Sequence, residues 1–128
     1  MILLDTCSLL WLVGAPGSLS AAAGAALAQP GTHVFFSTIS VFEIGQKAAR
    51  GKLSLPQSLE EWIEAAAAHH GLEELSLDRR SAIRAAGLPD LHRDPFDRLL
   101  IATAQVQRLT LLTPDPKIRQ YPDLQTAW

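Results

Sequence analysis

Short, continuous apolar runs alternate with longer stretches of helical periodicity along this chain. The runs predict buried strands at residues 2–4, 33–37, 72–77 and 110–113, and a short edge strand at 125–128. The stretches between them predict helices at residues 6–13, 20–29, 40–49, 58–70 and 78–86, and one that opens at 94–95. Apolar strands alternating with helices are typical of a parallel sheet covered on both faces. The expected fold class is therefore an α/β three-layer sandwich with a central parallel sheet of four to five strands.

The stretch HRDPFDRLLIATA, at residues 92–104, carries the strongest local signal. Asp94 is the expected N-cap, Pro95 suits the first helical position, and Asp97 falls in the first turn. The residues behind them are apolar or small nearly all round the helix, which predicts that its body is buried. A carboxylate at the mouth of such a helix has the rigid support that a functional site needs. The simpler interpretation is that Asp94 and Asp97 only start the helix.

Composition bounds the class of protein. The chain has 128 residues, 48% of them hydrophobic, which predicts a single domain over residues 1–128. The single cysteine, Cys7, excludes an internal disulfide and suits a reducing compartment. The N-terminus lacks the basic segment of a signal peptide, and the alanine-rich stretch at 21–28 is too short to span a bilayer. We therefore expect a soluble, cytoplasmic protein with no membrane partner.

The net charge of −2 argues against a protein that holds nucleic acid by bulk positive charge. Any site for a polyanion must then be local, or must use a metal ion.

Four acidic residues fall where predicted strands end or helices begin. Asp5 follows the first strand, Glu43 lies early in the helix after the second, Asp97 opens the helix before the fourth, and Asp115 follows the fourth. The carboxyl ends of parallel strands share one edge of the sheet, where α/β proteins place their sites. Each acid also has a simpler interpretation. Asp5 and Asp97 would cap helices, Glu43 would form a capping box with Ser40, and Asp115 would be a turn residue.

Taken together, the four acids favour a cation site. Carboxylates within ~4–6 Å of one another repel and raise each other's pKa values unless a cation neutralises them. A set of Asp and Glu residues with no nearby His or Cys predicts Mg²⁺ or Mn²⁺ rather than zinc. His92 is expected near the site but is not a required ligand. Cys7 is expected in the core. Such ions activate water and stabilise the charge that develops in phosphodiester hydrolysis.

Four segments, MILLDTCSLLWL, SVFEIGQKAARGKLSL, HRDPFDRLLIATA and LLTPD, resemble the PIN-domain family, and within it the VapC toxins of bacterial toxin–antitoxin pairs. The resemblance covers essentially the whole chain. It implies an Mg²⁺- or Mn²⁺-dependent endoribonuclease, the toxin of such a pair, that hydrolyses RNA with a metal-activated water and leaves 5′-phosphate and 3′-hydroxyl ends. It also implies a homodimer, a cognate VapB-like antitoxin, and tRNA or rRNA as the substrate.

The same resemblance assigns roles position by position. The family's acidic quartet, expected to be catalytic and to hold the metal, corresponds to Asp5, Glu43, Asp97 and Asp115. Residues that would orient these carboxylates or a bound water are Thr6, Ser37 and Thr113, while Asp94 is an additional acid interpreted as a cap or a supporting group. Asp115 lies between Pro114 and Pro116, which restrict its loop and its reach to the metal. Basic residues near the acids, the candidates for RNA contact, are Lys47, Arg50, Lys52, Arg93 and Arg98.

Other functions fit less well. A haloacid-dehalogenase-type phosphatase needs a second Asp two residues after the first, where this chain has Cys7. A response-regulator receiver needs paired acids after the first strand and a phosphorylated Asp after the third, and residues 78–80 match this poorly. The alternatives that stay open are a non-catalytic PIN-like binding or scaffold module, a PIN nuclease outside a toxin–antitoxin pair, and a nuclease that cuts DNA.

Overall fold

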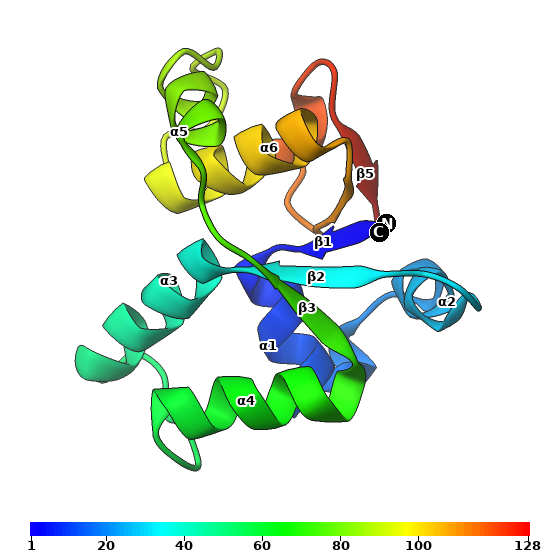
Figure 1. The fold of residues 1–128 in the computed structure, drawn as a ribbon, viewed down its shortest axis with the longest axis vertical. Coiled ribbons are helices and arrows are strands. Elements are labelled where there is room, and N and C mark those ends of the chain that lie inside the picture. Colours follow the sequence, from blue (N-terminus) through cyan, green and yellow to red (C-terminus); the bar gives the residue numbers. More distant parts are fainter.

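Five short parallel strands form the middle layer of the molecule in the computed structural model, which describes residues 1–128 (Figure 1). In sequence order the strands are β1 (Ile2–Leu4), β2 (Val34–Ser37), β3 (Leu72–Leu75), β4 (Thr110–Leu112) and β5 (Gln125–Ala127). They are arranged β3-β2-β1-β4-β5, and every neighbouring pair is parallel. This arrangement confirms the predicted fold class, with five strands in the sheet.

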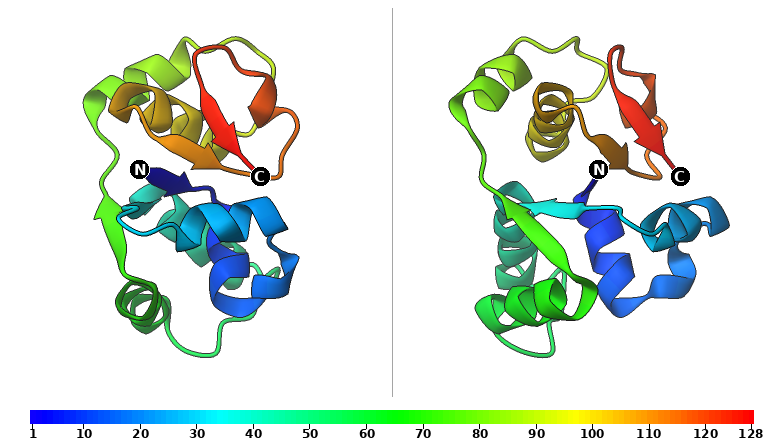
Figure 2. Two further views of the ribbon diagram at one scale, coloured as in Figure 1. Left: turned by 90° about the vertical axis from the view of Figure 1, so that its right-hand side faces the viewer. Right: turned by 45° about the vertical axis from the view of Figure 1, so that its right-hand side comes forward.

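The central strand β1 shows how the sequence builds a core on each face of the sheet. Successive side chains of a strand point to opposite faces, so Ile2 and Leu4 enter one cluster of buried residues and Leu3 enters the other. The first cluster includes residues of α1 (Thr6–Gly14), α2 (Ala21–Ala28), α3 (Thr38–Ala49) and α4 (Leu59–His70). The second is built mainly on α6 (Pro95–Gln107), against which α5 (Arg79–Ala86) packs (Figures 1 and 2).

Side-chain caps fix most helix starts as the sequence predicts. Ser20, Ser58, Asp78 and Asp94 each accept a hydrogen bond from a backbone N–H in the first turn of α2, α4, α5 and α6. The predicted start of α3 at residue 40 is wrong by two positions. The hydroxyl of Ser37 accepts from the N–H of Ile39 at 3.0 Å, so α3 begins at Thr38.

Two further differences lie in the connections. The third strand ends at Leu75 rather than at residue 77, where the N–H of Leu77 turns to the hydroxyl of Thr38 at 3.3 Å. A 3-10 turn, η1 (Pro16–Ser18), follows α1 and was not predicted, and a second one, η2 (Ile118–Gln120), lies among the C-terminal prolines. None of the helices is long and apolar enough to cross a membrane.

The sheet order brings three strand ends together. Because β1 lies between β2 and β4 and all three are parallel, Asp5, Ser37 and Thr113 fall at one edge of the sheet, at the carboxyl ends of these strands. α1 and α3 begin at this same edge, so the residues of their first turns border it. This edge is where the candidate site forms.

Candidate active site

Asp5 combines a structural role with a place at the site. Its side chain is 4% exposed, and its Oδ1 accepts a hydrogen bond of 2.7 Å from the N–H of Ser8, so it does cap α1. Burial raises the pKa of this carboxyl, the hydroxyls of Thr113 and Ser8 act against that rise, and the charge of Asp115 adds to it. Its interpretation as a helix cap is therefore correct, and the cap places a buried carboxylate at the end of the central strand.

Glu43 is held from two sides rather than by a capping box. The helix already has its cap at Ser37, so the Ser40–Glu43 capping box is not formed. Instead, Thr6 Oγ1 lies 2.6 Å from Glu43 Oε1, and Lys47 Nζ lies 3.2 Å from Glu43 Oε2. Thr6 Oγ1 is also 2.9 Å from the hydroxyl of Ser40, a fully buried residue that the sequence reasoning did not assign to the site. Its position one turn before Glu43 on the same helix is the signal that was available.

His92, which the sequence places near the site without a role as a ligand, links the other two acids. Its Nε2 is 2.9 Å from Asp97 Oδ2 and 3.0 Å from Asp115 Oδ2, and these three atoms lie within 4.8 Å of one another. The N–H of Asp94 donates to His92 Nδ1 at 3.3 Å. With Nδ1 as the acceptor, the ring nitrogen that faces the two carboxylates is the donor Nε2. Asp115 therefore joins the site despite its flanking prolines.

The carboxylates raise one another's pKa values, as expected where acids gather without a bound cation. The pKa of Asp97 rises to about 7, first because of burial and then because of the charge of Asp94, with smaller contributions from Glu43 and Asp5. Only His92 acts in the opposite direction. Cys7 is half-buried beside these groups rather than in the core, and burial with the charge of Asp5 raises its thiol pKa to about 11. It is thus kept as an unreactive thiol.

The residues expected to orient the carboxylates have distinct contacts. Thr6 reaches Glu43 directly, whereas Ser37 caps α3. Thr113 Oγ1 accepts from the N–H of Asp115 at 3.2 Å, and Asp94 Oδ1 accepts from the N–H of Phe96 at 2.9 Å. Asp94 is therefore the N-cap of α6, which leaves Asp97 free of any capping role.

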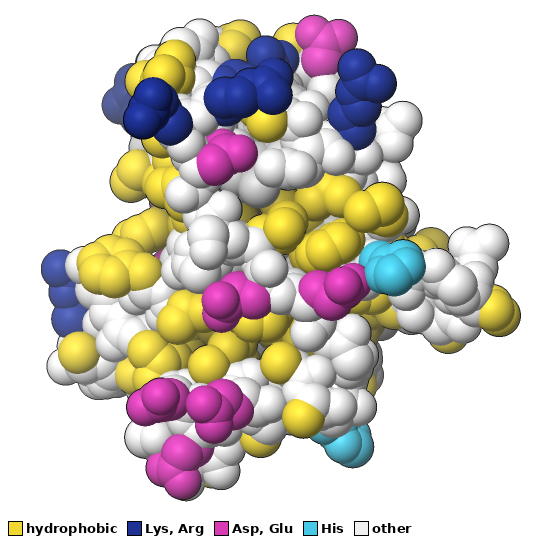
Figure 3. All heavy atoms as spheres, in the orientation of Figure 1, with side chains coloured by type: hydrophobic (Ala, Val, Ile, Leu, Met, Phe, Trp, Pro, Cys, Tyr) yellow, Lys and Arg dark blue, Asp and Glu magenta, His cyan; other side chains and the backbone are white.

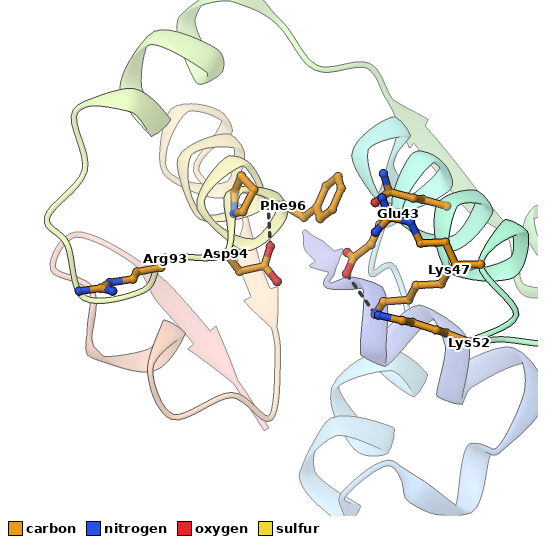
Figure 4. Close-up of a pocket in the computed structure, with 9 residues that line it drawn as sticks. Glu43, Lys47, Lys52, Arg93, Asp94 and Phe96 are labelled. Atoms are coloured by element: carbon orange, nitrogen blue, oxygen red, sulfur yellow. Dashed lines mark hydrogen bonds and ion pairs between the residues drawn. The ribbon is translucent and has the colours of Figure 1, made fainter.

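A groove of about 500 Å³ runs from Glu43 on α3 to Asp94 at the start of α6 (Figure 4). Four of the five basic residues proposed for RNA contact line it: Lys47, Arg50, Lys52 and Arg93. Figure 4 shows Lys47 and Lys52 on the wall that carries Glu43, and Arg93 on the opposite wall, pointing away from it. On the face drawn in Figure 3, acidic side chains gather over α4 and basic side chains over α5. The groove is thus a local concentration of positive charge beside the acids.

Arg98 is not part of that groove, and its interpretation as an RNA contact is wrong. Its guanidinium donates to the carbonyl oxygens of Ala85 and Leu88 at 2.9 Å each, Pro89 at 3.1 Å and His92 at 3.2 Å. These bonds use the donors of both terminal nitrogens. Arg98 instead holds the segment that follows α5. Its hydrogen bond to the carbonyl of His92 positions that residue against the acids.

The donor set fits a hard divalent ion. Asp5, Glu43, Asp97 and Asp115 reach one edge of the sheet from four separate segments, and their oxygens are the ligand type that Mg²⁺ and Mn²⁺ prefer. Burial and mutual repulsion at Asp5 and Asp97 are costs that a bound cation would relieve.

This repulsion predicts how the stability of the metal-free protein depends on pH. The folded-state pKa of Asp97, about 7, exceeds its ordinary value of 3.8, so the folded protein holds this proton more tightly than the unfolded chain. Its stabilising contribution is full below about pH 4 and is lost as pH rises through 7. In chelator, urea unfolding between pH 5 and 8 should therefore give a falling free energy of unfolding, by about 1–2 kcal/mol. Asp97→Asn should flatten this slope, and an equal slope in both proteins would contradict the assignment.

Carboxylates at the carboxyl edge of a parallel sheet, beside a basic groove, are arranged where α/β proteins place their functional sites. The model of the PIN domain matches residues 2–124, and the chain belongs to the PIN domain family.

Known proteins similar to this chain in sequence or in fold match it over nearly its whole length. Ribonuclease VapC22 of Mycobacterium tuberculosis is 29% identical over 130 residues, covering 99% of this chain and 98% of the relative. The fold is similar to that of VapBC2 from Rickettsia felis, bound to a DNA fragment from its promoter, with a TM-score of 0.70 and 16% identity over 98% of this chain and 97% of that one. DNA-bound VapBC from Salmonella typhimurium gives the same TM-score and identity over 98% and 95%.

Proposed function

We propose that this protein is a metal-dependent endoribonuclease that acts as the toxin of a toxin–antitoxin pair and hydrolyses phosphodiester bonds of tRNA or rRNA. The observation that carries the proposal is the set of acids around Asp97 in a PIN-domain chain: Asp115 lies beside it across His92, and the charges of Glu43 and Asp5 act on its carboxyl. The similarity to ribonuclease VapC22 supports the activity, and the VapBC complexes among the structural neighbours support the toxin role.

In this proposal Asp5 and Asp97 hold Mg²⁺ or Mn²⁺, and Glu43 and Asp115 complete the site directly or through water. When bound, such an ion would supply an activated water and stabilise the charge that develops on the phosphate. Thr6 fixes the orientation of Glu43 through its 2.6 Å contact. No side chain of the protein acts as a nucleophile.

Other residues prepare the substrate and the geometry. The imidazole of His92 holds Asp97 and Asp115 at a fixed separation through its contacts of 2.9 and 3.0 Å. Lys47, Arg50 and Lys52 attract the RNA backbone into the groove, where phosphates make most of the affinity. Arg93 extends the same positive surface from the other wall.

The partners we propose are a cognate VapB-like antitoxin and a second copy of the chain, and the compartment we propose is the cytoplasm. The antitoxin is supported by structural neighbours that are VapBC complexes. Expression of the chain alone should arrest bacterial growth, and co-expression of the antitoxin encoded beside it should restore growth. Growth that is unaffected by the active chain would contradict the toxin role.

The nuclease activity is tested by incubating purified protein with total RNA in Mg²⁺, in Mn²⁺ and in chelator. Discrete cuts should form with either ion and disappear with chelator. Glu43→Gln, which removes a buried charge from the site, should lower the cleavage rate by about 10²-fold or more. Glu64→Gln, the same change at an exposed position of α4, should cleave like the wild type. Intact RNA under all conditions, together with no detectable metal binding, would favour a non-catalytic binding module.

A further inference from the structure

The two oxygens of Glu43 have partners of very different mobility. Oε1 lies 2.6 Å from the hydroxyl of Thr6, which is 4% exposed and fixed in the first turn of α1. Oε2 lies 3.2 Å from the ammonium of Lys47, whose side chain is 45% exposed. The lysine is one helical turn from the acid on α3, so the pair is an ordinary i, i+4 contact that needs no other element to form.

A divalent ion and this ammonium compete for the same oxygen. Both are positively charged, and Oε2 is the oxygen of Glu43 that the buried hydroxyl of Thr6 does not contact. Of the two partners, only Lys47 can leave, because its flexible stem is half exposed, whereas Thr6 is buried.

Lys47 has a second place to go. It lines the groove together with Gln46, Arg50 and Lys52, and Figure 4 shows its side chain crossing the space in front of α3 toward Glu43. An ammonium released from Glu43 stays tethered at the groove wall, where an RNA phosphate would be its nearest strong acceptor.

We infer that Lys47 is an internal counter-ion that holds the place of the divalent ion on Glu43 and, when the ion binds, moves to a phosphate of the RNA. This inference rests on the proposed function for its RNA partner, but not for its ion pair. Its consequence is that the ion and the RNA bind cooperatively. The ion takes Glu43 and the RNA takes Lys47, so the binding of either one breaks the ion pair and frees the other residue.

The ion-pair half is tested with Mn²⁺ alone, by titration followed by electron paramagnetic resonance. Lys47→Met should bind Mn²⁺ about 3–10-fold more tightly than the wild type, because the competing charge is gone. Lys52→Met removes the same charge from the same groove without touching Glu43 and should change the affinity much less. An affinity that falls or is unchanged in Lys47→Met, or that rises equally in both variants, would overturn the inference.

The RNA half uses a labelled single-stranded RNA, with Ca²⁺ as a slowly reacting ion and a gel to confirm that the RNA stays intact. Lys47→Met should weaken RNA binding when Ca²⁺ is present and have little effect in chelator, where Lys47 is held by Glu43. Lys52→Met should weaken binding equally in both conditions. Equal losses for Lys47→Met in both conditions would overturn the exchange. If no protein binds RNA at all, the proposed function fails, while the Mn²⁺ titration still decides the ion pair.

Discussion

Asp97→Asn should lower the RNA cleavage rate by about 10²–10³-fold and, in the same protein, raise the melting temperature in chelator. The activity falls because the proposed metal site loses a charged oxygen ligand. The stability rises because the substitution removes a buried carboxylate whose pKa is raised to about 7 by burial and by its acidic neighbours. The helix start is unaffected, since Asp94 rather than Asp97 is the N-cap.

Two controls make this result specific. Asp90→Asn makes the same chemical change at an exposed residue and should leave both activity and melting temperature close to wild type. Saturating Mn²⁺ should raise the melting temperature of the wild type more than that of Asp97→Asn, because only the wild type retains the full ligand set. An Asp97→Asn protein that cleaves RNA normally, or that is less stable than the wild type in chelator, would show that Asp97 is a structural residue.

Arg98→Ala should destabilise the fold by about 2–4 kcal/mol, far more than removal of an ordinary surface arginine. The guanidinium donates to four backbone carbonyls, those of Ala85, Leu88, Pro89 and His92. Alanine removes all four bonds and leaves this segment held by fewer contacts, such as those of the Tyr121 hydroxyl with the carbonyls of Pro89 and His92. Because one of the four lost bonds is to His92, the substitution should also loosen the imidazole between Asp97 and Asp115, and lower the cleavage rate.

Urea unfolding measures this effect directly. Arg93→Ala, at an exposed position five residues earlier, is the matched control and should change the free energy of unfolding by less than about 0.5 kcal/mol. Arg98→Lys keeps the charge but lacks the planar fork, so its stability should lie between those of Arg98→Ala and the wild type. Equal stability of Arg98→Ala and Arg93→Ala would mean that the four hydrogen bonds contribute nothing measurable.

The fold was predictable because its signals are local. The apolar run at residues 2–4 allows only a buried strand, and its alternation supplies both faces of the sheet with core residues. Ser58 with Glu61 and Asp94 with Pro95 mark helix starts by chemistry that acts within one turn. The start of α3 was missed because Ser37 and Ser40 are both good caps, and only the end of β2 decides between them.

The site was harder to predict because its contacts cross the fold. The placement of Asp5, Glu43, Asp97 and Asp115 at one edge follows from parallel strands, which the alternation of strands and helices predicts, whereas the strand order came from the structure. The contact of His92 with Asp115 spans 23 positions, and no local pattern encodes it. Arg98 has the same difficulty, since beside Asp97 in sequence it looks like a charge at the site, whereas its side chain donates to carbonyls in the last turn of α5 and just after it.

The ends of the cleaved RNA test the central claim most directly. That claim is hydrolysis by a water activated at the four carboxylates, with no nucleophile from the protein or from the RNA itself. Products of a defined RNA should then carry 5′-phosphate and 3′-hydroxyl ends, found by mass spectrometry and formed only with Mg²⁺ or Mn²⁺. Products with 2′,3′-cyclic phosphate and 5′-hydroxyl ends, formed equally in chelator, would contradict the account. They would instead indicate attack by the 2′-hydroxyl, with His92 as the base beside it.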